Sequence, residues 1–275
     1  ETWAEAERAR IGEERFRREH ECEFLIFDET LINSITLADM EGVPPVETTG
    51  QVRWYKRPTP GHTYMVSLDP SMGTGGDFAG IQVFELPTFE QVGEWHHNTT
   101  PMNQQVRILQ GINKHIHDTI MEKDSTATPQ IFYSMENNTI GEAALMRVMD
   151  IGEENIMGMF LSEPIRKGHR RKFRRGFNTT AKFKIDACTK FKELVESGKM
   201  KISSQLLISE LKDFVASGLS YKAKPGQHDD LVSACLLMTR MMKVLADFDP
   251  KIFERWTDRS SEMTTPMPIF GNFYG

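Results

Sequence analysis

The sequence predicts an α/β domain in which a mixed central β-sheet carries α-helices on its faces. Three β-rich runs, at residues 63–69, 79–86 and 91–98, follow one another across short turns that contain Gly or Pro. Such close spacing favours antiparallel neighbours. Beyond residue 100, runs with a helical period alternate with short apolar strands, which is the order of elements typical of α/β domains.

A long helix is predicted after the third strand, over residues 102–123. Its apolar residues recur at helical spacing and share one face: Val106, Leu109, Ile112, Ile116 and Ile120. The next elements are a short buried strand at 130–136, a helix at 140–150 and a strand at 155–162.

An amphipathic helix is predicted over residues 181–198, with Cys188, Phe191 and Val195 on one stripe and Gly198 as its stop. The domain is then completed by a short strand at 199–202, a helix at about 205–216, the segment 219–223 and a final helix at about 229–246.

Composition divides the chain into three parts. The first part is residues 1–58, in which residues 1–40 are mostly helical and charged in pattern and a following stretch with Pro44, Pro45 and Pro58 is typical of a linker. Residues 59–248 hold the α/β domain, and residues 249–275, rich in Pro, Thr and Ser, are expected to form a flexible tail. The start at Glu1 rather than Met indicates a fragment of a longer protein.

Composition also limits the class of protein. The chain is 39% hydrophobic and 26% charged, as expected of a globular protein, and no apolar run reaches the ~18 residues that a membrane span needs. No secretory signal opens the sequence. Cys22, Cys188 and Cys235 are unclustered, which argues against a disulfide framework or a cysteine zinc site and fits a reducing compartment.

The net charge of −6 is unevenly spread. Residues 1–45 carry 12 acidic and 5 basic side chains, which leaves 27 acidic and 28 basic side chains for the rest of the chain. The main domain is therefore close to neutral, and the overall acidity does not exclude nucleic acid as a partner.

Four acidic residues stand at the ends of predicted elements. Asp69 closes the first strand, Glu136 closes the strand at 130–136, and Asp229 and Asp230 open the last helix. Asp77 ends the Gly-rich turn that follows Asp69. Ligand sites gather at strand ends in α/β sheets, so these acids can meet in one place. Such a cluster suits Mg²⁺, and two ions together can activate a water and stabilise the leaving oxygen of a phosphodiester.

Each acid also has a structural explanation. Asp229 or Asp230 can cap the last helix, where negative charge is favoured. Asp69 fits a turn and Asp77 a solvated loop, whereas Glu136 is harder to explain because its strand otherwise favours burial.

A basic run lies between the strand at 155–162 and the helix at 181–198. It can be a solvated face, a nuclear-localisation signal or, with Phe173 and Phe177 interleaved, a contact to DNA phosphates without sequence specificity. Lys182 and Lys184 follow at the next helix start, either near a bound phosphate or on the surface. The run comprises Arg166, Lys167, Arg170, Arg171, Lys172, Arg174 and Arg175.

Three motifs in this order resemble the nuclease domain of the large terminase subunit of tailed bacteriophages, most closely the contractile-tailed type. They are "MVSLDPSMGTGGDFAGIQVFE", "IFYSMENNTIGEA" and "GQHDDLVSACLLM". The resemblance covers about residues 60–245 and implies a ribonuclease H-like fold. It further implies a metal-dependent endonuclease that cuts concatemeric double-stranded DNA during headful packaging.

Carried over by position, the resemblance makes Asp69, Glu136 and Asp230 the catalytic, metal-binding acids. Asp229 matches the neighbouring acid, as a cap or a further metal ligand, and Asp77 matches an acid of the same loop. His228 is similar to a position that is often His in this family. It can orient a ligand or contact the phosphate, although a turn-stabilising role explains it equally well. The implied cofactor is Mg²⁺ or Mn²⁺, since both accept oxygen ligands.

The resemblance extends upstream, where residues 1–58 look like the tail of a preceding ATPase domain plus its linker. The chain contains no Walker A motif, so we do not expect it to hydrolyse ATP. The implied partners are double-stranded DNA and, in the full-length protein, the N-terminal ATPase domain, the portal protein and the small terminase subunit. The implied location is the host cell cytoplasm.

Two other functions compete with the nuclease. One is a non-catalytic DNA-binding packaging adaptor whose carboxylates only brace loops. The other is an actin- or sugar-kinase-like ATPase, whose fold also places an acid and a Gly-rich turn after the first strand; the missing second phosphate loop and the basic run count against it. Metal-dependent nicking of plasmid DNA supports the nuclease, whereas a thermal shift with ATP supports the kinase-like fold.

Overall fold

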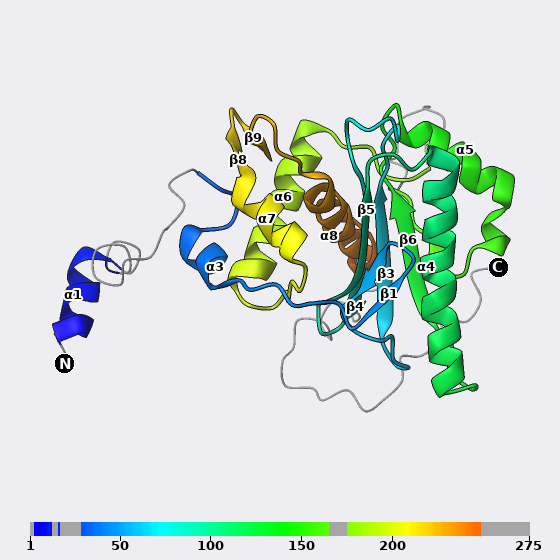
Figure 1. Cartoon of the computed structure of the whole chain (residues 1–275), viewed down its shortest axis with the longest axis horizontal. Helices are drawn as coiled ribbons and strands as arrows, with labels where there is room; N and C mark the ends of the chain where they lie inside the picture. Colours follow the sequence, from blue (N-terminus) through cyan, green and yellow to red (C-terminus); the bar gives the residue numbers. More distant parts are fainter. Residues whose placement is uncertain (1–2, 13–15, 17–28, 165–174, 249–275) are drawn as a thin grey trace.

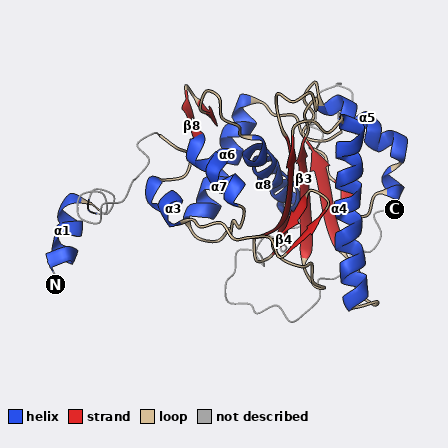
Figure 2. Ribbon diagram, in the orientation of Figure 1, coloured by secondary structure: helices blue, strands red, loops and turns tan. Residues whose placement is uncertain are grey.

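A seven-stranded mixed sheet lies between two layers of helices in the computed structural model, which describes residues 3–12, 16, 29–164 and 175–248 (Figures 1 and 2). The strand order is β1-β2-β5-β4-β3-β6-β7, antiparallel from β1 to β3, with β6 and β7 joined in parallel. The strands are β1 Glu47–Thr49, β2 Val52–Trp54, β3 Thr63–Asp69, β4 Ala79–Leu86, β5 Glu90–His97, β6 Gln130–Met135 and β7 Met159–Phe160.

Different helices cover the two faces of the sheet (Figure 2). One face carries α4 (Met102–Lys123) and α5 (Gly141–Ile151), followed by the short helix η1 (Glu153–Asn155). The other carries α8 (Asp230–Phe248), with α6 and α7 packed against it. The remaining bounds are α1 Trp3–Ile11, α3 Ser34–Asp39, α6 Ala181–Glu196, α7 Gln205–Asp213, and a hairpin of β8 Phe214–Ser217 and β9 Ser220–Ala223.

Two hydrophobic cores hold these layers together because alternate side chains of a strand point to opposite faces. In β3, Tyr64, Val66 and Leu68 pack toward α4, whereas Met65 belongs to the core under α8. Ser67 also faces α8, where its hydroxyl donates a hydrogen bond to the Ala234 carbonyl at 2.7 Å. The sheet is thus covered on both sides, and all eight residues of β4 are buried.

The predicted fold class is confirmed, and most elements lie within one or two residues of the predicted ranges. The predicted strand at 155–162 is wrong in extent, since η1 ends at Asn155, Gly158 has φ 104° and only Met159 and Phe160 pair with β6. The predicted helix at 205–216 ends at Asp213, because Phe214 pairs with Ala223 in the hairpin. The segment 199–202 contributes one bridge, Lys201 to Glu90.

The predicted linker contains two strands that extend the sheet. Strand β2 pairs with β5, and the Arg53 guanidinium donates a hydrogen bond to the buried Glu94 carboxylate at 2.9 Å. Leu31, Ile32 and Leu37 are also fully buried in the core. These residues pack on the α/β domain, while the division of the chain into ATPase tail, nuclease domain and C-terminal tail stays a prediction.

Two predicted features lie outside the described residues: most of the basic run and the C-terminal tail at 249–275. Within the described ranges, every helix is too short or too polar to cross a lipid bilayer.

Candidate active site

The sheet register places three residues side by side across β3, β4 and β5. Asp69 is paired with Gly80, and Gly80 is paired with His96. Directly opposed residues of neighbouring strands point to the same face, so Asp69 and His96 face the same layer with only a glycine between them. Glu136 follows β6 beside them, and its N–H donates to the Leu68 carbonyl at 3.2 Å.

Gly80 allows the start of α8 to approach this row. A Cβ at position 80 would lie 2.9 Å from the Asp230 carbonyl oxygen, closer than real Cβ atoms come to backbone. Because glycine has no side chain, the first residue of α8 can rest above the middle strand. Asp230 therefore lies above the row that runs from Asp69 to His96.

Three of the other predicted acids are near enough to Asp69 to affect its ionisation. Burial raises the pKa of Asp69 well above its usual value, and the nearby carboxylates of Glu136, Asp230 and Asp229 raise it further. Burial and like charges both disfavour the ionised carboxylate. A divalent cation would relieve this repulsion, and carboxylate oxygens are the ligands that Mg²⁺ and Mn²⁺ accept, so the donor set fits the predicted metal.

A cavity of about 120 Å³ opens beside these acids. Asp69 and Glu136 line it together with Lys184 of α6 and Arg240 of α8. The Lys184 ammonium lies 3.9 Å from an Asp229 carboxylate oxygen. Arg240 is ion-paired with Glu163, and one of its Nη atoms donates to the Thr179 hydroxyl at 3.0 Å. The cavity thus offers carboxylates to a cation and a lysine to an anion.

The adjacent aspartates have different surroundings. The Asp229 carbonyl accepts the Ser233 N–H at 2.7 Å, which starts the hydrogen bonding of α8, but its carboxylate accepts the N–H of Ala223 in β9 at 3.3 Å. The first-turn N–H of Val232 donates instead to Glu210 of α7 at 3.0 Å. One of the two roles predicted for Asp229 was a side-chain cap of α8. The structure gives that place to Glu210, a glutamate from another helix, because Glu210 accepts the Val232 N–H.

The structure places the remaining predicted residues at various distances from the acids. The side chain of His228 is 43% exposed, and its Nδ1 lies 3.7 Å from Oδ2 of Asp230. Asp77 is exposed in the turn before β4, and Lys182 is exposed in the first turn of α6. Arg175 is ion-paired with Glu153. Outside the described residues lie Arg166, Lys167, Arg170, Arg171, Lys172 and Arg174.

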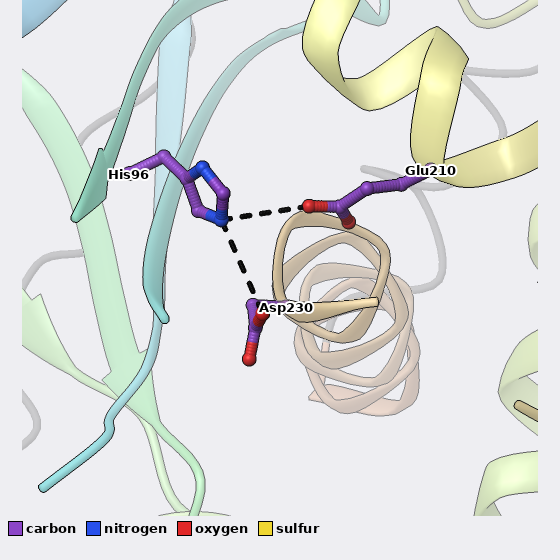
Figure 3. A group of neighbouring side chains, drawn as sticks. All are labelled: His96, Glu210 and Asp230. Carbon is purple, nitrogen blue, oxygen red and sulfur yellow. Dashed lines mark ion pairs between the residues drawn. The ribbon is translucent and has the colours of Figure 1, made fainter. Parts of the chain in front are cut away.

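Sequence reasoning missed two residues of this region, His96 and Glu210. In the part of the chain that the structure describes, His96, Glu210 and Asp230 form a group whose metal-ligating atoms all lie within 4.8 Å of one another (Figure 3). Of the predicted acids, this group contains Asp230 alone. A signal for Glu210 was present, since its place between Leu207 and Leu211 puts a carboxylate on the buried face of α7. His96 lies in a strand that was assigned no site residue.

Comparison with known proteins gives one family and a consistent fold. Residues 66–241 match the family model of the terminase RNaseH-like domain. The large terminase nuclease of thermophilic phage G20c is 17% identical, with a TM-score of 0.56, and the match covers 77% of this chain and 98% of that one. That nuclease has also been solved with bound magnesium and with bound cobalt, each 16% identical to this chain with a TM-score of 0.56.

Two further structures share the fold. The large terminase nuclease domain of Thermus phage P74-26 is 17% identical, with a TM-score of 0.52, over 74% of this chain and 91% of that one. The Mn-soaked, inhibitor-bound human cytomegalovirus terminase nuclease domain is 16% identical, with a TM-score of 0.52, over 79% of this chain and 97% of that one. Since the family model spans more than half of the chain and its ribonuclease H-like fold is the one observed, the chain belongs to the terminase RNaseH-like domain family.

Proposed function

We propose that this chain is the metal-dependent endonuclease of a viral genome-packaging terminase, which cuts concatemeric double-stranded DNA with little sequence specificity. The observation that carries the proposal is that Asp69 from β3 and Glu136 from the end of β6 line one cavity at the start of α8, where burial first, and then the charges of Glu136 and Asp230, raise the pKa of Asp69. Membership of the terminase nuclease-domain family supports the same activity.

In this proposal Asp69, Glu136 and Asp230 hold Mg²⁺ or Mn²⁺, with Asp229 and the exposed Asp77 as further ligands. A bound pair of such ions would activate the attacking water and stabilise the leaving oxygen of the phosphodiester. The related G20c nuclease, solved with bound magnesium and with bound cobalt, supports a divalent ion here. Lys184 faces the same cavity and neutralises the scissile phosphate, and His228 orients Asp230 from the rim.

The described residues on either side of the basic run lie close to each other and to Glu136. The Glu163 N–H donates to the Gly176 carbonyl at 3.2 Å, so the two ends of the segment that carries the run are joined. Phe177 then bridges to Glu136, with the Asn137 N–H donating to the Phe177 carbonyl at 2.7 Å. We therefore assign the run, with Lys182, to contacts with the phosphates of DNA that approaches the acids.

The wider setting of the proposal is the packaging motor. The chain would act with double-stranded DNA, a preceding ATPase domain, the portal protein and the small terminase subunit, in the host cell cytoplasm. Family membership supports this setting at the level of a terminase.

Plasmid nicking tests the activity. Asp69→Asn, Glu136→Gln and Asp230→Asn are each expected to reduce Mg²⁺- or Mn²⁺-dependent nicking by more than about 100-fold, since even losses around a metal ligand cost about 10–100-fold. Each change removes charge and almost no volume, so the variants should remain folded in thermal melts. Asp247→Asn, at the exposed far end of α8, is the matched control and should cut normally.

Near-normal nicking by the Asp230→Asn variant would remove that residue from the catalytic set. A folded wild-type protein that binds DNA but never cuts it, with either metal, would instead indicate the packaging adaptor. A thermal shift with ATP would indicate the kinase-like fold.

A further inference from the structure

Three buried polar atoms without a hydrogen-bond partner point toward one another at the start of α8. They are His96 Nε2, Glu210 Oε1 and Asp230 Oδ2. His96 Nε2 lies 3.5 Å from Glu210 Oε1 and 4.0 Å from Asp230 Oδ2, as Figure 3 shows. Unpartnered buried polar atoms are rare in folded proteins, so three that converge on one point require a common explanation.

Separate contacts hold each side chain in place. Glu210 uses its other oxygen to accept the Val232 N–H at 3.0 Å, and its side chain is 9% exposed. The His96 ring stacks on Phe78, with ring centroids 4.2 Å apart and an interplanar angle of 16°. The backbone of Asp230 rests directly above Gly80, which sets where its side chain begins. The three atoms are therefore preorganised from β5, α7 and α8.

Direct pairing does not satisfy these atoms. The two distances from His96 Nε2 exceed the ~2.7–3.2 Å of a good hydrogen bond. The distance to Glu210 Oε1, 3.5 Å, matches the ~3.5 Å that separates ligand atoms around a shared tetrahedral ion with bonds of ~2.0–2.2 Å, and the distance to Asp230 Oδ2, 4.0 Å, is longer. All three atoms lie within 4.8 Å of one another, so the side chains need only draw together for one ion to bind all three.

We propose that His96, Glu210 and Asp230 bind a divalent transition-metal ion at a site separate from the Asp69–Glu136 cavity. The donor set decides the class of ion. An imidazole nitrogen with two carboxylate oxygens suits Zn²⁺, Mn²⁺ or Co²⁺, whereas Mg²⁺ prefers oxygen ligands alone. Three protein ligands leave a fourth position open to water.

Asp230 links this site to the acids at Asp69. Asp69 and Glu136 line the cavity described above, whereas His96 and Glu210 are not among its lining residues and instead group with Asp230. The two oxygens of Asp230 can face the two sites, and filling the transition-metal site would orient the carboxylate that the proposed nuclease uses. The metal site itself requires only the three side chains and is testable without DNA.

Cobalt binding to the full chain tests the proposal. We expect Co²⁺, added with excess Mg²⁺ to fill the oxygen-only positions, to bind as one tight ion with an imidazole ¹⁴N coupling in its pulsed electron paramagnetic resonance. His96→Gln should remove the coupling and weaken Co²⁺ binding at least about tenfold. Glu210→Gln keeps an oxygen for the Val232 N–H but loses the charged ligand, so it should weaken binding without unfolding the chain.

His117→Gln is the matched control, because His117 lies on α4 across the sheet. This change should leave the imidazole ¹⁴N coupling of the bound Co²⁺ unaltered. The proposal is overturned if the coupling survives in the His96→Gln variant, or if Mg²⁺ displaces the Co²⁺ ion as readily as Zn²⁺ does. A buried water at this position would give no nitrogen-coupled ion in the wild type and would also overturn it. If the wild-type protein shows the nitrogen-coupled Co²⁺ signal but does not nick DNA, the result contradicts the nuclease proposal and leaves the metal site standing.

Discussion

Glu85 is a fully buried carboxylate in the middle of a charged group. Burial alone would raise its pKa, but hydrogen bonds with His62, Lys56 and Thr88 outweigh burial and lower it to about 2. His62 Nδ1 lies 3.3 Å from the carboxylate, and the Thr88 hydroxyl donates to it at 2.8 Å. Through Lys56 this residue ties the segment before β3 to the sheet.

The lowered pKa predicts how stability depends on pH. A carboxylate whose folded pKa is below its unfolded value of 4.5 contributes stability above pH 4.5 and loses it as pH falls toward 2. Glu85→Gln should therefore reduce the free energy of unfolding at pH 7 by about 1–3 kcal/mol and flatten its decline between these two pH values. Urea unfolding at pH 7 and at pH 3 measures both effects.

Glu122→Gln, an exposed change on α4, is the control and should behave as the wild type at both pH values. If the free energy of unfolding falls equally with pH in the Glu85→Gln variant and in the wild type, other carboxylates are responsible for the loss of stability in acid.

At the scale of elements, the contact between β4 and the start of α8 sets the geometry of both candidate sites. Gly80→Ala places a Cβ 2.9 Å from the Asp230 carbonyl oxygen, which is closer than real Cβ atoms come to backbone, so α8 must shift at its first turn. Such overpacking should cost about 1–3 kcal/mol of stability. The shift should also weaken the metal-induced rise in melting temperature, because Asp230 moves away from its partners.

Gly111→Ala is the opposite case in the same chain. Gly111 is an exposed interior residue of α4, and a Cβ there meets no atom within 4 Å. Since alanine is the better helix former, this change should stabilise the protein by about 0.5–1 kcal/mol. Melts of both variants, with EDTA and with Mn²⁺, compare them, and a Gly80→Ala protein that melts like the wild type would refute the close contact.

At the scale of the whole molecule, charge separates an acidic N-terminal part from a near-neutral domain with one basic run. If the run contacts DNA, replacing Arg170, Arg171 and Arg174 with Ala should weaken binding similarly for unrelated sequences. The slope of log K against log[salt] should flatten by up to about 0.9 for each lost duplex phosphate contact. Arg175 is left unchanged because it is ion-paired with Glu153.

Binding titrations at several salt concentrations measure this slope. Arg107→Ala, an exposed change on α4 across the sheet, is the control and should leave it unchanged. An unaltered slope in the triple variant would mean that the run is only a solvated surface.

The sequence by itself determined the fold class and most elements of this protein. The spacing of apolar residues predicted β3, β4, β5 and α4 closely, because the periodicity of a single strand or helix depends only on consecutive residues. It also predicted that Asp69, Glu136 and Asp230 stand at element ends, since turn formers flank each of them.

Only the tertiary structure decided how these elements meet. Strand β2 joins β5 through Arg53 and Glu94, which are 41 residues apart, and Val232 takes its cap from Glu210, 22 residues away. His96 lies next to Asp230 because Gly80 of β4 pairs with His96, and the lack of a side chain at Gly80 lets the first residue of α8 pack closely on it. Such contacts join residues from separate elements, and no local pattern encodes which elements will pack together. The predicted acids, and the place of Glu210 on an apolar helix face, were therefore visible in the sequence, but the approach of His96 and Glu210 to Asp230 became visible only in the folded chain.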